Sequence, residues 1–408
     1  MTGGFGGPGE RSEHAARSAA APRSERVAIV GIGLHPFGRF DGVTGLEMGA
    51  YSVRQAVRDA GMEWSDVQTA FGGSWHAGFA DSLVSLLGLT GIQFTHVFNG
   101  CATAGTAVAM AARAISSGAV DTALAVGFDK HPRGAFASDP GLIGIGDWYA
   151  QTGLMLTTQF FAMKINRYMH EFGISHATLA KVAAKNYRNA AINPNAWRRK
   201  PWSEDEIANA PMLNYPLTHY MFCSPDEGAA AVVMCRADQA HRYTDRPIYL
   251  RAAEVQTRRF GAFEVFSPSL PLERVPAPTV DTAKATFEAA GISPSDVEVA
   301  QIQDSESGAE IMHMSENGFC ADGEQERMIA DGDTEIGGRL PINTDGGLIG
   351  NGEPIGASGL RQIYEICLQL RGDAGERQVP GRDGNGPKVG YTQVYGAPGT
   401  AACTIMTV

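Results

Sequence analysis

One cysteine of the chain lies where a predicted strand gives way to a predicted helix. Residues 98–105 read Phe-Asn-Gly-Cys-Ala-Thr-Ala-Gly, so Cys101 occupies the turn and small residues follow it. Backbone N–H groups at a helix start favour an anion, lower the pKa of a thiol and can form an oxyanion hole for a thioester carbonyl. A lone cysteine is equally often a small buried core residue. Cys101 is therefore either part of a reactive site or a packing residue.

Three segments in the second half of the chain combine polar side chains with glycines or a strand end, at residues 299–306, 341–359 and 391–399. The first is a predicted strand that runs into Asp304 and Glu306. Glycine-rich loops such as the other two let a backbone approach a ligand closely. Each segment alone could instead be a set of tight turns, and one of the two acids could be a helix cap or a first-turn acid.

The elements that must position these residues alternate between strand and helix. A short apolar strand at 27–33 precedes a predicted helix at 45–61, and a strand–helix–strand run follows from about 94 to 127. This alternation is typical of an α/β fold. The stretch 132–225 departs from it, with predicted helices at 155–171 and 177–190 between loops, so we interpret it as an insertion that covers one end of the sheet.

An internal repeat divides the chain into two similar halves. Residues 56–67 resemble residues 286–297 at a constant offset of 230, and in both copies a helix ends on glycine before a Ser-Asp loop and a strand. We therefore expect a duplicated α/β fold with halves at 27–235 and 245–408. Residues 1–26 are mostly Gly, Ala, Ser, Arg and Glu, and are predicted to form a flexible tail.

Composition excludes several classes of protein. The formal net charge of −11 argues against broad nucleic-acid binding, and no apolar run approaches the ~20 residues of a membrane span. The six cysteines are scattered without a Cys-x-x-Cys pair, which argues against a zinc ribbon or a disulfide framework. That pattern fits a reducing cytoplasm, and we expect no metal site and no cofactor bound on this chain.

Taken together, the segments resemble the thiolase superfamily, specifically the sterol-carrier-protein-like thiolases. The most specific match is Asn343-x-x-Gly-Gly followed by Gly352-Glu353-Pro354-x-Gly-Ala-Ser-Gly, which is similar to the family's Asn-x-x-Gly-Gly…Gly-His-Pro-x-Gly-Ala-Ser-Gly block. The resemblance covers about residues 26–408. It implies a five-layer αβαβα fold with a covering-loop insertion, a CoA thioester as substrate, and a dimer or tetramer, most simply a homodimer. It also places Cys101 where the family carries its acylated nucleophile.

The chain departs from the family pattern at the positions that perform the usual chemistry. Glu353 replaces the histidine of Gly-His-Pro, and Gln303-Asp304-Ser305-Glu306 replaces the His-Asp-Cys-Phe motif of the sterol-carrier type. Tyr395 is the approximate counterpart of the family's acid/base near the C-terminus. The loop residues Asn343, Gly352 and Gly396 are expected to support the substrate or its oxyanion.

A glutamate beside Cys101 changes the chemistry that the site favours. An ionised Glu353 disfavours a neighbouring thiolate, whereas a carboxylate is a reasonable base for a hydroxyl when burial raises its pKa. We therefore favour a retro-aldol cleavage of a bulky 3-hydroxyacyl-CoA, with Glu353 or Asp304 as base and Tyr395 as acid. Steroid side-chain aldolases of this superfamily work with a small OB-fold and zinc-ribbon partner, which the resemblance also implies here. Two alternatives are a true thiolase or acyltransferase that acylates Cys101, and a non-catalytic acyl-CoA-binding scaffold.

Overall fold

A computed structural model of the chain describes residues 26–262, 264 and 275–408. The predicted flexible tail, residues 1–26, lies outside the described residues except for Arg26. In the described part of the chain, no helix combines the length and the apolar character that crossing a membrane requires.

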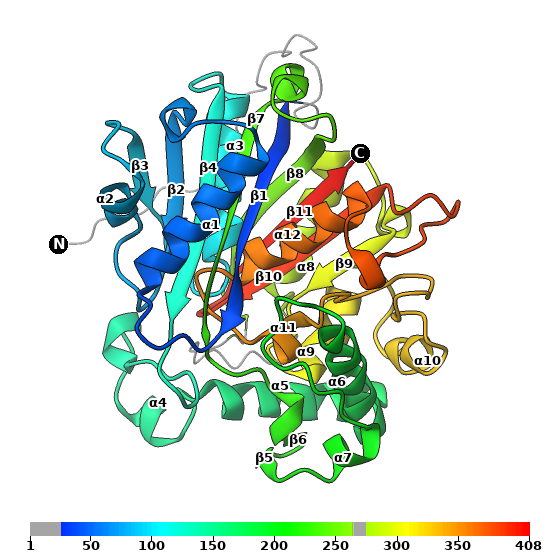
Figure 1. Cartoon of the computed structure of the whole chain (residues 1–408). Coiled ribbons are helices and arrows are strands. Elements are labelled where there is room, and N and C mark those ends of the chain that lie inside the picture. The colour runs from blue at the N-terminus through cyan, green and yellow to red at the C-terminus, as the bar shows by residue number, and fades with distance from the viewer. Residues whose placement is uncertain (1–25, 263, 265–274) are drawn as a thin grey trace, which may run out of the picture.

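Nine described strands form one mixed sheet, which crosses the molecule (Figure 1). In order across the sheet they are β3 (Gln93–His96), β2 (Thr69–Gly73), β4 (Thr122–Lys130), β7 (Glu227–Arg236), β1 (Val27–Gly38), β8 (Ile248–Thr257), β11 (Thr400–Thr407), β10 (Val389–Gly396) and β9 (Val299–Ile302). Strands β2, β3 and β4 pair in parallel, as do β9 and β10, and the other pairs are antiparallel. The sheet is therefore mixed and contains two parallel portions near its two edges.

The strand order is the same in the two halves of the sheet. The first half runs β3-β2-β4-β7-β1, and the second runs from a parallel bridge at Ile342 through β9, β10 and β11 to β8. The halves meet where β1 pairs with β8 through only Ala28 with Tyr249 and Ile29 with Ile248. The predicted duplication is therefore visible in the strand order, while the residue boundaries that we gave for the two halves stay a prediction.

Helices divide the fold into five layers. The helix α1 (Gly45–Asp59) packs its apolar side on β1, β4 and β7, and α8 (Pro278–Ala290) and α9 (Ser307–Glu316) cover the outer face of the second half. Between the two halves lie α3 (Thr103–Ser116) and α12 (Ser358–Arg371), whose buried residues share one core with strands of both halves. The predicted α/β fold with five layers is confirmed.

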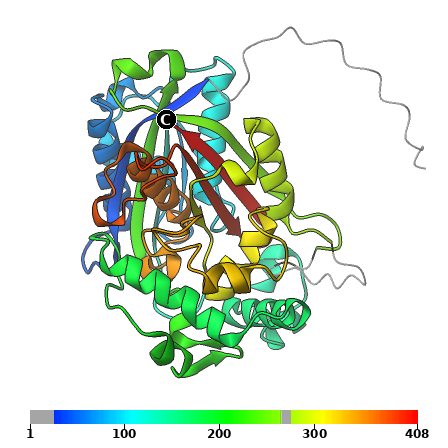
Figure 2. The ribbon, with the colours of Figure 1, turned by 90° about the vertical axis from the view of Figure 1, so that its right-hand side faces the viewer.

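The insertion forms a helical layer at one end of the sheet, at the bottom of Figures 1 and 2. Its elements are α4 (Trp148–Gln151), α5 (Thr157–Phe172), α6 (His176–Ala191), α7 (Glu204–Ala208) and the small hairpin β5 (Met212–Asn214) and β6 (Leu217–Thr218). The side chain of Ser175 caps α6, and Gly173 ends α5 in a left-handed conformation. Helices were predicted at 155–171 and 177–190, close to where α5 and α6 occur. The remaining short helices are α2 (Val84–Leu87), α10 (Gln325–Ala330) and α11 (Gly347–Asn351).

A buried ion pair attaches the insertion to the second half of the sheet. Lys185 of α6 lies with its Nζ 2.9 Å from Glu310 Oε1 of α9 and donates a 2.7 Å hydrogen bond to the carbonyl of Ile342. Asn186 of α6 donates to the other oxygen of Glu310 at 2.9 Å. Since both charged side chains are almost fully buried, neither has water as an alternative partner.

We therefore expect Lys185→Met to lower the free energy of unfolding by about 3–5 kcal/mol, because it leaves the Glu310 charge buried without its partner. Urea denaturation followed by circular dichroism measures this change. Lys284→Met is the matched control, since the Lys284 side chain is 76% exposed on α8, and we expect it to change stability by less than about 0.5 kcal/mol. Equal effects of the two substitutions would contradict a structural role for the buried pair.

Candidate active site

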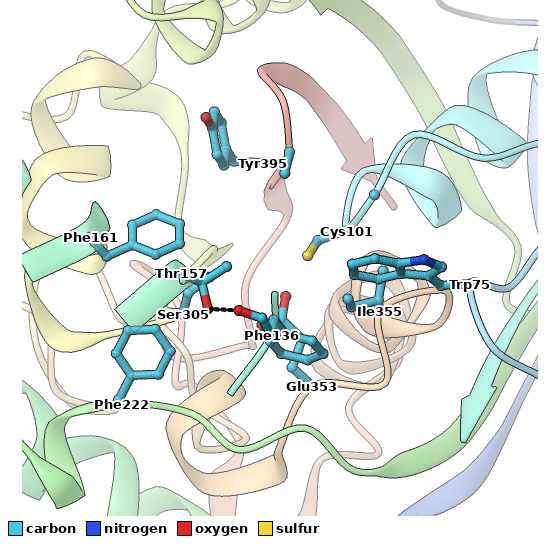
Figure 3. Close-up of a pocket in the computed structure, with 12 residues that line it drawn as sticks. Trp75, Cys101, Phe136, Thr157, Phe161, Phe222, Ser305, Glu353, Ile355 and Tyr395 are labelled. Atoms are coloured by element: carbon cyan, nitrogen blue, oxygen red, sulfur yellow. Dashed lines mark hydrogen bonds between the residues drawn. The ribbon is translucent and has the colours of Figure 1, made fainter. Parts of the chain in front are cut away.

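A pocket lies where the two halves and the insertion meet, and it contains three of the predicted site residues (Figure 3). Its cavity volume is about 40 Å³. Cys101, Glu353 and Tyr395 line it, together with Ser305 and with apolar side chains from all three parts of the chain. Its apolar lining comprises Trp75, Phe136, Phe161, Phe222, Ile355 and Ala397. The glycine-rich loops that the sequence singled out therefore do converge on one cavity.

Cys101 reaches the pocket from the turn that precedes α3, as expected for a residue at a helix start. This turn packs directly on the turn after β10, and a Cβ added at Gly396 would collide with the carbonyl of Asn99. Gly396 is therefore required by a close approach of two backbones, and its role toward the substrate stays a prediction. The contact fixes the position of the Cys101 turn relative to the second half of the chain.

The environment of Cys101 opposes formation of a thiolate. Burial raises the pKa of Cys101 well above its usual range, and the nearby charges of Glu353 and Asp129 raise it further. The effect of the helix start, which alone would lower the thiol pKa, is outweighed. At neutral pH Cys101 is therefore a protonated thiol beside the side chain of Glu353.

Glu353 is held at its carboxylate and at its backbone. Its Oε1 accepts a 3.0 Å hydrogen bond from Gln303 Nε2, and its Oε2 accepts a 3.2 Å hydrogen bond from the thiol of Cys223. Its backbone N–H donates to the carbonyl of Ser224 at 2.9 Å. The side chain is 2% exposed and lines the pocket, so it presents a fixed carboxylate to whatever occupies that space.

Gln303 and Ser305 occupy the strand end that replaces the family motif. Gln303 Nε2 also donates to Ser305 Oγ at 3.0 Å, and the Gln303 backbone N–H donates to Gln393 Oε1 at 3.0 Å. Among the described residues, no hydrogen-bond donor contacts the buried Oε1 of Gln303. These contacts link β9 to β10 and place one amide donor on Glu353.

Asp304 does not line the pocket. Its Oδ1 accepts a 2.6 Å hydrogen bond from the backbone N–H of Leu348, and its Oδ2 accepts from Ile349 N at 3.2 Å and from Asn186 Nδ2 at 2.9 Å. Burial and the charge of Glu310 raise the pKa of Asp304 well above its usual range. It therefore stabilises the start of α11, and the structure does not bring it together with Glu353. Its proposed role as a base stays a prediction.

Two neighbouring acids were not assigned to the site and have clear positions. Glu306 is the N-cap of α9, where it accepts from the backbone N–H of Gly308, as one interpretation of the sequence expected. Asp226 is fully buried beside Gly352, and a Cβ added at Gly352 would collide with its carboxylate. Burial raises the pKa of Asp226 well above its usual range, and the charge of Glu353 contributes to this rise. The pKa of Asp226 therefore depends in part on the charge of Glu353.

Tyr395 lines the pocket with its ring, and its hydroxyl points away from Cys101 (Figure 3). The hydroxyl donates a 2.6 Å hydrogen bond to Glu264 Oε2, which lies 3.6 Å from Lys164 Nζ. Burial raises the pKa of Glu264, and the positive charge of Lys164 opposes that rise. In this arrangement the Tyr395 proton is directed toward Glu264, and its role as an acid toward substrate stays a prediction.

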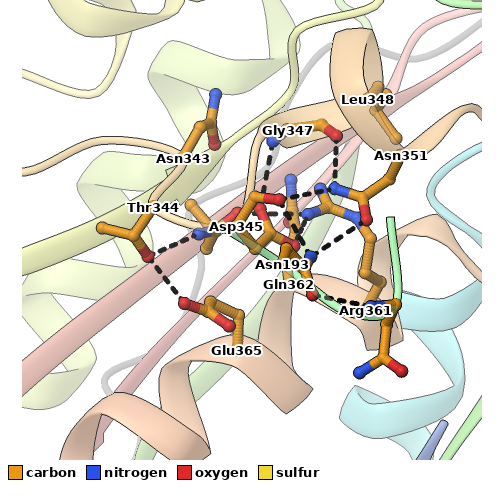
Figure 4. Close-up of polar contacts among 12 residues, drawn as sticks. Asn193, Asn343, Thr344, Asp345, Gly347, Leu348, Asn351, Arg361, Gln362 and Glu365 are labelled. Carbon is orange, nitrogen blue, oxygen red and sulfur yellow. Dashed lines mark hydrogen bonds and ion pairs between the residues drawn. The ribbon is translucent and has the colours of Figure 1, made fainter. Parts of the chain in front are cut away.

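Asn343 and its neighbours form a buried framework under the loop that carries Glu353. Asn343 Nδ2 donates to Glu310 Oε2 at 2.7 Å, and its Oδ1 accepts from Ile302 N at 3.0 Å. Farther along the loop, Asp345 pairs with Arg361 of α12, and Asn193 and Asn351 donate to its carbonyl at 2.9 and 3.1 Å (Figure 4). Asn343 therefore contacts this framework, outside the residues that line the pocket.

Sequence reasoning missed Cys223, Asp226 and the aromatic lining that the insertion contributes. Cys223 and Asp226 lie in the segment before β7, where no spacing or repeat distinguished them. Phe136, Phe161 and Phe222 belong to the predicted insertion, whose position over the pocket gave no information about individual side chains. Among the described residues, no cluster of three or more His, Cys, Asp or Glu side chains is placed to hold a metal ion.

Comparison with known proteins assigns the chain to a family. Residues 27–201 match the thiolase N-terminal domain, and residues 273–407 match the thiolase C-terminal domain-like family. The acetyl-CoA acetyltransferase of Methanothermobacter thermautotrophicus is 34% identical over 397 residues, which cover 93% of this chain and 99% of the relative. The chain belongs to the thiolase superfamily.

Two further comparisons locate the chain within this superfamily. Sterol carrier protein 2 of Oryctolagus cuniculus is 30% identical over 93% of this chain and 71% of its own length. The solved structure of an "Ltp2-ChsH2(DUF35) aldolase" has a TM-score of 0.84 and 25% identity, and covers 95% of this chain and 99% of its own. The chain thus lies in the sterol-carrier-protein-like branch and is a thiolase-like enzyme, an aldolase or an acyltransferase.

The charge of Glu353 should control the reactivity of Cys101 toward alkylating agents. Because this charge raises the thiol pKa, Glu353→Gln should lower that pKa and increase the thiolate fraction at neutral pH. We expect Cys101 to react with iodoacetamide about threefold to tenfold faster in the variant at pH 7.5, as measured by peptide mass spectrometry. The buried Cys403 serves as the internal reference, and an unchanged or slower reaction at Cys101 would show that Glu353 does not act on this thiol.

Proposed function

We propose that the enzyme cleaves a carbon–carbon bond of a bulky 3-hydroxyacyl-CoA by a retro-aldol reaction. The observation that carries this proposal is the carboxylate of Glu353, which lines the pocket beside a thiol whose pKa is raised. A carboxylate is suited to accept a proton from a hydroxyl, whereas the neutral thiol is a poor nucleophile. The same arrangement disfavours the acylation of Cys101 on which a thiolase depends.

In the proposed reaction, Glu353 accepts the proton of the substrate's 3-hydroxyl group. The Cα–Cβ bond then breaks, and its electron pair moves into the thioester, giving an aldehyde or ketone and a thioester enolate. The protonated Glu353 returns its proton to Cα, so the base is regenerated and no free CoA is consumed. The fixed position of the carboxylate supports this cycle, because a base that takes a proton from one substrate atom and returns it to another must have a defined orientation.

The lining of the pocket supports an apolar acyl group. Five aromatic side chains surround the space beside Cys101, and Trp75 and Phe136 are stacked with their ring centroids 6.4 Å apart. Such walls favour an apolar group through burial and ring contacts. We propose a substrate from sterol side-chain breakdown, which agrees with the sterol-carrier-protein-like relatives and with the aldolase named for the structural neighbour.

A second cleft adjoins the pocket and is suited to the anionic part of CoA. Phe136 and Phe222 line both spaces, and the second cleft also contains Arg39, Arg133 and the ring of Trp197. Phosphate groups favour arginine side chains, and an adenine can stack on an aromatic ring. We propose that the CoA moiety lies here and that the acyl group extends past the shared rings toward Glu353.

We expect Arg133→Ala to raise the KM for an acyl-CoA about tenfold while kcat changes less than about twofold, since a phosphate contact far from the reacting bond contributes equally to ground-state and transition-state binding. Steady-state kinetics with the acyl-CoA substrate measures both constants. Arg199→Ala is the matched control, because Arg199 is exposed in the insertion and is not among the residues that line the cleft. A fall in kcat with an unchanged KM would contradict the assignment of Arg133.

We further propose a homodimer and an additional protein partner. The edge strand β3 and its neighbours expose Phe79, Leu89 and Phe98, with 71%, 84% and 44% of their surface accessible. An exposed sheet edge with apolar side chains is suited to pairing with a second copy. The name of the structural neighbour includes a second component, ChsH2(DUF35), which supports a partner chain. We propose that this partner is the small protein with an OB-fold and a zinc ribbon that the family resemblance implies.

One assay separates the proposed aldolase from its alternatives. The purified protein, with and without such a partner, is incubated with a 3-hydroxyacyl-CoA, and separately with a 3-ketoacyl-CoA and free CoA. Cleavage of the hydroxy substrate without free CoA supports the aldolase. Cleavage of the keto substrate that requires CoA identifies a thiolase, which the retention of Cys101 in the pocket favours. Binding without cleavage of either substrate identifies a scaffold.

Cys101→Ser distinguishes the first two reactions in a single variant. The retro-aldol step forms no bond to Cys101, so we expect its rate to remain within about tenfold of the wild type. Thiolysis requires an acylated thiol, and should therefore be lost. Product analysis by liquid chromatography of the CoA species measures both, and complete loss of hydroxyacyl-CoA cleavage would contradict the proposed mechanism.

A further inference from the structure

Cys223 contacts the proposed base from a part of the chain that the reaction does not otherwise use. It follows Phe222 at the end of the insertion and precedes β7, and it is 5% exposed. Its thiol donates a hydrogen bond to Glu353 Oε2 at 3.2 Å, and its backbone N–H donates to the carbonyl of Ser305 at 2.9 Å. It borders the second cleft and is not among the residues that line the pocket beside Cys101.

The two oxygens of Glu353 are held by two different donors. Gln303, after β9, donates to Oε1, and Cys223, from the insertion, donates to Oε2. The backbone around Cys223 also pairs with Glu353, since Glu353 N donates to Ser224 O and Pro225 forms a parallel bridge with Glu353. A carboxylate with a donor on each oxygen has one preferred orientation, and removal of either donor frees the side chain to rotate.

We propose that Cys223 is a positioning residue for the Glu353 base, and that its thiol fixes the carboxylate toward the substrate. This inference rests on the proposed role of Glu353 in the retro-aldol reaction. Cys223 lines the second cleft, where the CoA moiety is proposed to lie, and not the pocket beside Cys101, so it acts on the reacting atoms through Glu353.

The choice of a thiol for this position has a physical reason. Burial and the charge of Glu353 raise the pKa of Cys223 well above its usual range, so the thiol keeps its proton and remains a donor at neutral pH. A thiol is also a weak donor compared with a hydroxyl. It therefore orients the carboxylate and withdraws little of its basicity, whereas a stronger donor stabilises the ionised form and makes it a weaker base.

The substitutions Cys223→Ala and Cys223→Ser should shift the pKa of the Glu353 carboxyl in opposite directions. Cys223→Ala removes the donor, so we expect kcat to fall about tenfold to a hundredfold with KM within about twofold, because the base is no longer held in place. The acid limb of the pH–rate profile should move to higher pH, since a carboxylate with fewer donors retains its proton more strongly. Cys223→Ser replaces the thiol by a hydroxyl, which is a stronger hydrogen-bond donor. We therefore expect kcat to stay within about threefold and the acid limb of the pH–rate profile to move to lower pH.

A packing role for Cys223 predicts a different result. Cys367→Ala is the matched control, because Cys367 is a fully buried cysteine of α12 and is not among the residues that line the pocket. Loss of a buried sulfur lowers stability in both alanine variants but does not move a pH profile. If Cys223→Ala and Cys367→Ala have the same kcat and the same pH profile, or if Cys223→Ser moves the acid limb in the same direction as Cys223→Ala, the proposal is overturned.

Crystal structures of the variants test the inference without turnover. We expect the Glu353 carboxylate to adopt a second orientation in Cys223→Ala and to keep a single orientation in Cys223→Ser. If the wild-type protein cleaves no acyl-CoA, the proposed function fails while this comparison still tests the positioning. If Glu353 keeps the same single orientation in Cys223→Ala, the inference fails even where activity is lost.

Discussion

The burial of one ionisable carboxylate between three parts of the chain is the constraint on which this structure depends. Glu353 is 2% exposed, and a charge at such a position is costly unless donors replace the lost water. Gln303 from the second half and Cys223 from the insertion supply those donors, and the turn of Cys101 from the first half lies opposite. The pocket exists only when all three parts are correctly placed.

Buried pairs behind the pocket connect the insertion to the second half and fix the loops within that half. Lys185 and Glu310 connect the insertion to α9, and Asp345 and Arg361 connect the loop before α11 to α12. Asp304 caps α11 itself, so the motif residue next to Gln303 supports the loop that ends at Glu353. The polar residues of this region therefore fall into two groups, one that faces the cavity and one that keeps the loops in position.

The sequence predicted the elements well and individual side-chain directions poorly. Periodicity and glycine positions located α1, α5 and α6, and the 230-residue offset revealed the duplication, because these signals are local or repeated. By contrast, Asp304 and Gln303 are adjacent, yet one points to α11 and the other to Glu353. The contact between Cys223 and Glu353 joins residues 130 positions apart, and no local sequence pattern predicts such a contact.

The two central helices give the site an approximate symmetry that has an electrostatic consequence. The helix α3 begins just after Cys101 and α12 begins just after the Glu353 loop, at equivalent places in the duplicated halves. Each helix start carries a partial positive charge, so a single ancestral unit, once doubled, brings two such ends to one cavity. In the proposed reaction, negative charge that develops on the thioester oxygen is then favoured from two sides. The doubled framework supplies this field regardless of the side chains, which leaves the residues between the helix ends free to change the chemistry.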